Sequence, residues 1–311
     1  MGDLEGFSPK ALIKLYSHPF PQPFDSLGPP AQSDKIAIRF KEHTMLDVAE
    51  QMRIKPSITD KVASLEGKVS PEEWKLRVDL AATYRLIAMH GWDDMIFTHI
   101  SARVPGPEHH FLINPYGLLF EEITASSLVK IDMDGHKVQE SPFPVNPAGF
   151  TIHSALHMNR DDAHCIIHLH TTDGVAVSAQ ADGLLPLDQH AMMICGDTAY
   201  HDYEGVALDL DERDRLVHDI GTKHVMILRN HGTLALGESC ADAFMRMYYL
   251  ERACSMQVRA LAGGVKPNMP NQGVPEKTAM QGYVAFNGMV GPFAWPALLR
   301  KLDRLDPSYR N

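Results

Sequence analysis

A pair of histidines in a short apolar run most constrains how this chain folds. His168 and His170 lie within Cys165–Thr171, whose remaining residues are mostly aliphatic. Such a run predicts a short buried strand. Because side chains alternate across a strand, residues two apart emerge on the same face. A sheet containing this strand therefore carries two imidazoles side by side.

A third histidine follows another apolar run. His231 lies just after the predicted strand Val225–Leu228. Two strand ends that bring three histidines together form a facial metal site with open positions, as metal-dependent lyases and oxygenases require. The chain has 17 histidines, so the spacing alone leaves open the alternative that these residues only pack in the core.

Composition narrows the class of protein. The 311 residues are 44% hydrophobic and 22% charged, which is typical of a globular chain that does not enter a membrane. A formal net charge of −10 predicts no nucleic-acid partner and no anionic membrane surface. The four cysteines lack C-x-x-C spacing, and residues 1–20 lack the apolar segment of a signal peptide. We therefore expect a cytoplasmic protein with reduced thiols.

The chain divides into three predicted parts. Residues 1–68 form an N-terminal arm rich in proline and polar residues, residues 69–264 a compact domain, and residues 265–311 a C-terminal extension with one short helix at 295–304. The compact domain begins at Ser70 and Glu73, which form a capping box.

Strands and helices alternate irregularly within the compact domain. Helices are predicted at 71–89, from 147, at 211–220 and at 239–262. Strands are predicted at 95–99, 111–114, 128–133, from 165, at 192–195, 225–228 and 233–236. This order predicts a mixed sheet with helices on both faces.

The order of motifs resembles the class II aldolase/adducin family, and within it the bacterial proteins most similar to adducin heads. The motifs span roughly residues 72–262 and are His90-Gly-Trp-Asp-Asp94, Thr98-His-Ile-Ser101, Asn114-Pro-Tyr-Gly117, Asn146-Pro-Ala-Gly-Phe150, His168-Leu-His170, Tyr200-His-Asp-Tyr203 and Arg229-Asn-His-Gly232. The resemblance implies a three-layer αβα fold around a mixed, mainly antiparallel sheet. It also implies a homotetramer with active sites between subunits.

The resemblance assigns roles to particular residues. It implies a divalent metal, most often Zn²⁺ with Fe²⁺ or Mn²⁺ as alternatives, held by His168, His170 and His231. It implies a substrate site for a small molecule at His99, Ser101 and the turn from Asn114 to Gly117. Two residues at the rim of the implied site are candidates for proton transfer, namely Tyr203 and His190.

One departure from the family argues against ordinary sugar-phosphate aldolase chemistry. The family aldolases carry a serine-serine-glutamate run, which falls here on Pro147, Ala148 and Gly149. These residues offer neither the phosphate-binding hydroxyls nor the carboxylate base. Loss of a general base removes roughly 10²–10⁴-fold of rate. His153 and His157, four residues apart on the following helix, are either a packed pair or a second zinc-binding pair.

Three functions remain open from the sequence. The first is a metal-dependent lyase, aldolase-like or a decarboxylase, acting on a small oxo or hydroxy acid. The second is an Fe(II)-dependent oxygenase, because a three-nitrogen face also suits iron. The third is a non-catalytic oligomeric interaction module like the head of adducin.

Overall fold

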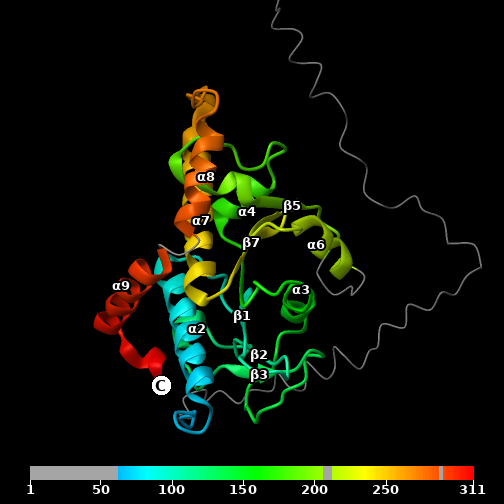
Figure 1. The fold of residues 1–311 in the computed structure, drawn as a ribbon, viewed down its shortest axis with the longest axis vertical. Coiled ribbons are helices and arrows are strands. Elements are labelled where there is room, and N and C mark those ends of the chain that lie inside the picture. The colour runs from blue at the N-terminus through cyan, green and yellow to red at the C-terminus, as the bar shows by residue number, and fades with distance from the viewer. Residues whose placement is uncertain (1–61, 206–211, 287–289) are drawn as a thin grey trace, which may run out of the picture. The chain divides into compact units, whose positions relative to one another are not determined.

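The computed structural model describes residues 62–205, 212–286 and 290–311 (Figure 1). Most of the predicted arm, residues 1–68, lies outside these ranges. No helix in the described ranges is long and apolar enough to cross a membrane.

Seven strands form one sheet in the spatial order β3-β2-β1-β4-β7-β6-β5. Their bounds are β1 His99–Arg103, β2 Phe111–Ile113, β3 Val129–Ile131, β4 Cys165–Leu169, β5 Thr198–His201, β6 Val225–Leu228 and β7 Gly232–Gly237. Only β5 and β6 pair in parallel, and every other pairing is antiparallel. The predicted mixed, mainly antiparallel sheet is confirmed, and β4, which carries His168, lies at its centre.

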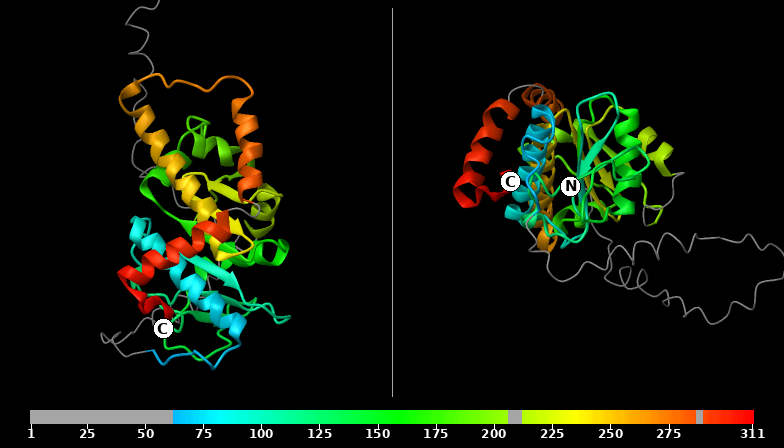
Figure 2. Two further views of the ribbon diagram at one scale, coloured as in Figure 1. Left: turned by 60° about the vertical axis from the view of Figure 1, so that its left-hand side comes forward. Right: turned by 90° about the horizontal axis from the view of Figure 1, so that it is seen from below.

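Helices cover both faces of this sheet. The α-helices are α2 Pro71–His90, α3 Pro147–Asn159, α4 Thr172–Ser178, α5 Gln189–Ile194, α6 Glu212–Ile220, α7 Cys240–Leu261, α8 Val274–Phe286 and α9 Val290–Leu305. The 3₁₀ turns are η2 Phe120–Glu122, η3 Cys195–Asp197, η4 Ala262–Gly264 and η5 Pro307–Arg310. Figures 1 and 2 show α2, α7 and α9 on one side of the sheet and α3 and α6 on the other.

Alternation along the strands divides the core between the two faces. In β4, Ile167 packs into the cluster under α2 and α7, whereas Ile166 packs into the cluster under α3 and α6. His168 has the same parity as Ile166 and so emerges toward the α3 side. The predicted three-layer αβα architecture is therefore confirmed, and it fixes the face on which the histidines lie.

Two predicted strands differ from the structure. The predicted strand 192–195 is wrong: this segment belongs to α5 and η3, because the Asp188 carboxylate accepts hydrogen bonds from the backbone N–H of His190 and Ala191 and caps the helix. The predicted strand 95–99 is displaced, since β1 begins only at His99. Met95 and Thr98 have φ of 51° and 64°, which extended strand geometry excludes.

The C-terminal extension holds more helix than the sequence predicts. The sequence predicts one short amphipathic helix at 295–304, after a stretch rich in proline, glycine and asparagine. The structure contains two long helices, α8 and α9. α8 packs on α5, and α9 packs on α2 and α7. Tertiary contacts, rather than local sequence, therefore support α8.

Candidate metal centre

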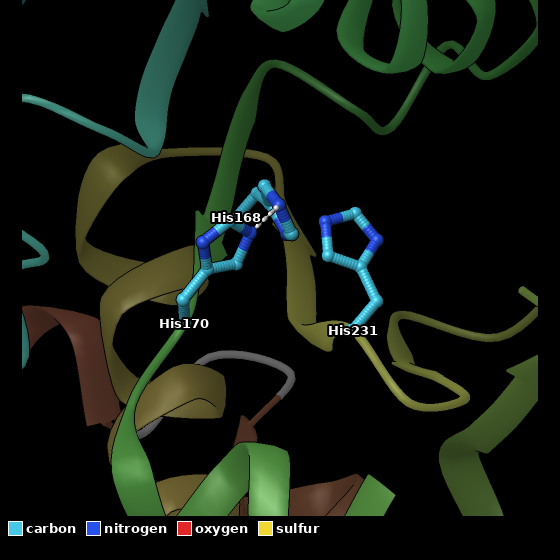
Figure 3. Close-up of side chains that lie close together, drawn as sticks. All are labelled: His168, His170 and His231. Atoms are coloured by element: carbon cyan, nitrogen blue, oxygen red, sulfur yellow. Dashed lines mark hydrogen bonds between the residues drawn. The ribbon is translucent and has the colours of Figure 1, made fainter. Parts of the chain in front are cut away.

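Three histidines converge at the ends of β4, β6 and β7. His168 lies in β4, His170 directly follows that strand, and His231 lies in the turn between β6 and β7 (Figure 3). One ring nitrogen from each lies within 4.8 Å of the other two. The Nε2 atoms of His168 and His170 are 3.0 Å apart. The structure thus brings together the three residues predicted as metal ligands.

Hydrogen bonds behind two of the rings fix where their protons lie. Nδ1 of His168 lies 3.0 Å from the backbone carbonyl oxygen of Thr233, and Nδ1 of His170 lies 3.3 Å from Asp94 Oδ2. Neither oxygen carries a hydrogen at neutral pH, so each Nδ1 is the donor. Each Nε2 is left as a lone pair that faces the centre of the cluster, which is the arrangement of metal-binding histidines.

Burial keeps the imidazoles of His168 and His231 uncharged. Desolvation, followed by the neighbouring His170 and His201, lowers the pKa of His231 to about 4. Desolvation also lowers the pKa of His168 well below its usual value. Neutral imidazoles are the form that binds a cation.

The donor set fits a small divalent ion. Zinc–nitrogen bonds of about 2.0–2.1 Å in a tetrahedron separate neighbouring nitrogens by about 3.3 Å. The Nε2 atoms of His168 and His170, 3.0 Å apart, are close to this separation. Three imidazoles and no cysteine leave at least one coordination position to an outside group, as in catalytic rather than structural zinc sites.

Buried polar side chains of β1 and α3 lie next to the three histidines. His99 in β1 lies directly opposite His168 in the antiparallel register, and its ring lies 5.4 Å from that of His168 and 4.2 Å from that of His153. His99 is 4% exposed, yet neither of its ring nitrogens has a hydrogen-bond partner. Burial lowers its pKa to about 3.

Two further atoms next to His99 are also unpaired. They are Oγ1 of Thr98, the preceding residue, and Nε2 of His153, whose ring contacts that of His99. An unsatisfied buried polar atom costs about 1–3 kcal/mol, so several at one place indicate a polar ligand or ordered water. Thr98 adds backbone strain, because a β-branched residue at φ 64° is an outlier.

Ser101 holds two histidines in a fixed relay. Nδ1 of His157 lies 2.6 Å from the carbonyl oxygen of Ala163 and must donate to it. Nε2 of His157 therefore accepts from the Ser101 hydroxyl at 2.7 Å, and that hydroxyl oxygen accepts from Nδ1 of His153 at 2.6 Å. The relay leaves Nε2 of His153 as a bare lone pair. Of the two readings of this pair, the structure has a packed, hydrogen-bonded one.

The predicted proton-transfer residues lie in different surroundings. The Tyr203 ring, 51% exposed, lies 5.8 Å from that of His231 and so borders the metal centre. His190, at the start of α5, contacts Asp188 at 3.3 Å and has its ring 4.9 Å from that of Tyr249. Among the described side chains, no ring contact joins His190 to the three histidines.

The predicted substrate residues lie around β1 and β2. Asn114 directly follows β2, and its Oδ1 lies 3.0 Å from the hydroxyl of Tyr84. Gly117 has φ 105°, a conformation that favours glycine.

Sequence reasoning gave no role to two residues of the site: Asp94, although it ends the motif His90–Asp94, and Glu251, which lies in no motif. Asp94 reaches His170 from a loop 76 positions earlier, and Glu251 lies behind the site on α7. Their roles depend on tertiary proximity alone.

The sequence matches a known family over most of the described domain. Residues 78–258 match the family described as Class II Aldolase and Adducin N-terminal domain. A Caulobacter vibrioides protein that bears an aldolase class 2 name is 57% identical over 251 residues, which cover 79% of this chain and 96% of that protein. The chain therefore belongs to the class II aldolase and adducin family.

Other relatives show the breadth of this family. Mouse alpha-adducin is 43% identical over 244 residues, which cover 74% of this chain but only 33% of alpha-adducin. The crystal structure of an aldolase II superfamily protein from Pseudomonas syringae has 51% identity and a TM-score of 0.76, covering 80% of this chain and 100% of that one. The L-fuculose 1-phosphate aldolase from Glaciozyma antarctica PI12 has 26% identity and a TM-score of 0.66, covering 81% and 96%.

Proposed function

We propose that this protein is a metal-dependent, lyase-type enzyme that acts on a small oxo or hydroxy acid, with Zn²⁺ held by His168, His170 and His231. The observation that carries the proposal is the pair of Nε2 lone pairs, fixed by Thr233 and Asp94 and facing one centre. A purely structural module has no need of neutral imidazoles with fixed tautomers around an open position.

Polar side chains next to the metal centre supply the groups that bind the substrate. When bound, the divalent ion polarises a substrate carbonyl or carboxylate oxygen as a Lewis acid. His99 then binds a remaining polar atom of the substrate through ring nitrogens that have no protein partner. Ser101 acts indirectly, because its hydroxyl holds His153 and His157.

The absent carboxylate favours decarboxylation over aldol cleavage. Gly149, in the first turn of α3, offers no base to remove a C–H proton. Decarboxylation breaks a carbon–carbon bond to release CO₂ and needs only a proton donor for the carbon left behind. We assign that donor to Tyr203, which borders His231, with His190 as the second candidate.

Metal analysis is the first test of this proposal. Purified protein loaded with zinc should hold one ion per chain, and His168→Ala and His170→Ala should each lose it. Stoichiometric metal in both variants would exclude the assigned ligands. Iron as the resident ion would favour the oxygenase, and manganese would keep the lyase.

A substrate screen tests the reaction class. Oxo and hydroxy acids are supplied to metal-loaded protein, and CO₂ release is followed. Tyr203→Phe and His190→Ala are then compared with the wild type at equal metal content. Full kcat in both variants would exclude both proton donors.

The similarity to alpha-adducin favours one second candidate, a non-catalytic interaction module. The match to alpha-adducin covers 74% of this chain. A site that stays empty at saturating zinc and iron would favour the module over the enzyme.

A further inference from the structure

We propose that Glu251 is a positioning residue whose carboxylate ties together the two chain segments that carry the three histidines and thereby sets the affinity for metal. The inference rests on the proposed metal site. It adds a determinant that lies behind the ligands, on another element of the fold.

Glu251 contacts both segments at once. It lies in the middle of α7 and is 1% exposed. Its Oε2 accepts a hydrogen bond from the hydroxyl of Thr171, and its Oε1 accepts one from the hydroxyl of Thr233 at 2.8 Å. One side chain therefore joins the end of β4 to β7.

Each threonine is coupled to a proposed metal ligand. Thr171 directly follows His170 in the chain. Thr233 lies two residues after His231, and its carbonyl oxygen is the atom that fixes the tautomer of His168. A shift of either threonine would consequently move a ligand ring or remove the acceptor that fixes the tautomer of His168.

The packing around this junction leaves little freedom. The hydroxyl of Thr171 also accepts from the backbone N–H of Gly174 and caps α4. A Cβ atom added at Gly174 would lie 2.6 Å from Thr171 Oγ1, 2.9 Å from Thr233 Cγ2 and 3.1 Å from Glu251 Oε1. The three side chains thus close tightly around a glycine, and the junction acts as a rigid clamp.

A structural role alone accounts poorly for this carboxylate. Among the described residues the partners of the Glu251 carboxylate are the two threonine hydroxyls and no Lys, Arg or His, and burial raises its pKa to about 7. Burying a carboxyl group without a cation is costly, and an apolar residue of similar size would fill the same space more cheaply. Two simultaneous acceptor bonds to the ligand segments explain why a carboxylate stands here.

The decisive experiment measures metal affinity in isosteric variants. Glu251→Gln keeps the size of the side chain but offers an acceptor oxygen to only one of the two hydroxyls. Thr171→Val and Thr233→Val each remove one hydroxyl. The control is Thr83→Val, which removes a buried hydroxyl that donates to the Asp79 carbonyl at 2.9 Å on α2.

We expect the dissociation constant for zinc, measured by chelator competition, to rise about 10–100-fold in Glu251→Gln and to rise in both threonine variants. Thr83→Val should stay within about twofold of the wild type. Cobalt-loaded protein provides the second readout, because a loosened ligand set changes the visible absorption of Co²⁺ in the clamp variants but not in the control.

The outcomes separate this inference from the function proposed above. Wild-type zinc affinity and cobalt spectra in all three clamp variants would overturn the role of Glu251 and leave the metal site standing. An equal loss of affinity in Thr83→Val would also overturn it, since general destabilisation would then be the cause. A wild-type protein that binds neither zinc nor cobalt would overturn the metal site and this inference together.

Discussion

At His168, His170 and His153, a hydrogen bond determines which ring nitrogen carries the proton. His168 and His170 expose Nε2 because carbonyl and carboxylate oxygens occupy their Nδ1 positions. His153 exposes Nε2 because Ser101 occupies its Nδ1. Histidines in this part of the fold therefore keep lone pairs at several points, and each lone pair is set by a neighbour that is distant in sequence.

The Ser101 hydroxyl binds two buried histidines, so its removal should destabilise the protein more than the loss of one hydroxyl usually does. Ser101→Ala leaves Nδ1 of His153 without its acceptor and Nε2 of His157 without its donor. Unsatisfied buried groups cost about 1–3 kcal/mol each, so the free energy of unfolding should fall by about 2 kcal/mol or more. Urea denaturation measures it. Ser178→Ala, which removes one local bond to the Val175 carbonyl at 2.8 Å, should cost less than half as much.

A second residue-scale prediction concerns pH. Burial lowers the pKa of His157 to about 3, whereas an unfolded histidine titrates near 6.5. Between these values only the unfolded state takes up the proton, so stability falls as pH falls below about 6.5, by about 1.4 kcal/mol per pH unit for this group. We expect the free energy of unfolding, measured by urea denaturation between pH 7 and pH 5, to depend less steeply on pH in His157→Gln. The difference in slope should correspond to the uptake of about one proton.

A cancelling contribution and a control variant make the comparison specific to His157. Glu251, whose pKa is raised to about 7, contributes a slope of opposite sign between about pH 4.5 and 7, but it is present in both proteins and cancels. His109→Asn, a change at an exposed loop histidine, should leave the slope unaltered. Equal slopes in the wild type and His157→Gln would show that His157 binds its proton equally in the folded and unfolded states, and so would contradict the lowered pKa.

At the level of elements, sequence was informative where local signals were strong. Ser70 caps α2 as predicted, with its hydroxyl accepting from the backbone N–H of Glu73. The alternation in β4 places His168 as expected. The same reasoning missed α8, which depends on packing, and misassigned α5, where an Asp188 cap outweighs the apolar run that follows. Asp94 ends one of the family motifs and Glu251 lies in none, but the contacts of both with the site follow only from the fold.

The packing of α8 can be tested at one glycine. A Cβ atom at Gly282 would lie 2.3 Å from the backbone oxygen of Met193 in α5. Gly282→Ala should therefore destabilise the protein by about 1–3 kcal/mol, although alanine is the better helix former. Thermal unfolding measures the loss. Gln281→Ala, on the exposed side of the same helix, should change stability by no more than about 0.5 kcal/mol.

For the molecule as a whole, family membership and site chemistry point in different directions. The fold is shared with an L-fuculose 1-phosphate aldolase, but Gly149 cannot supply a base. We expect no appreciable retro-aldol turnover of fuculose-, rhamnulose- or ribulose-type phosphates by zinc-loaded protein. A coupled assay for the aldehyde product measures it. Turnover of about 1 s⁻¹ or faster would show that another residue acts as the base.

The surface of the C-terminal helices argues for self-association. Met280, Tyr283 and Val284 lie three and four residues apart on α8 and are 72%, 63% and 59% exposed. Phe293 on α9 is 79% exposed. Clustered large apolar side chains of this kind mark interaction sites in globular proteins. We expect a homo-oligomer, and a tetramer from the family resemblance.

Light scattering at micromolar concentration tests the oligomer, and it should report a mass several times the 34.6 kDa of one chain. Met280→Glu combined with Val284→Glu should lower that mass, because charged side chains resist burial in an apolar contact. Lys277→Glu, an exposed change on the same helix, is the matched control and should leave the mass unchanged. A wild-type monomer would contradict the expectation outright, whereas an oligomer that survives the double substitution would place the contact on another surface.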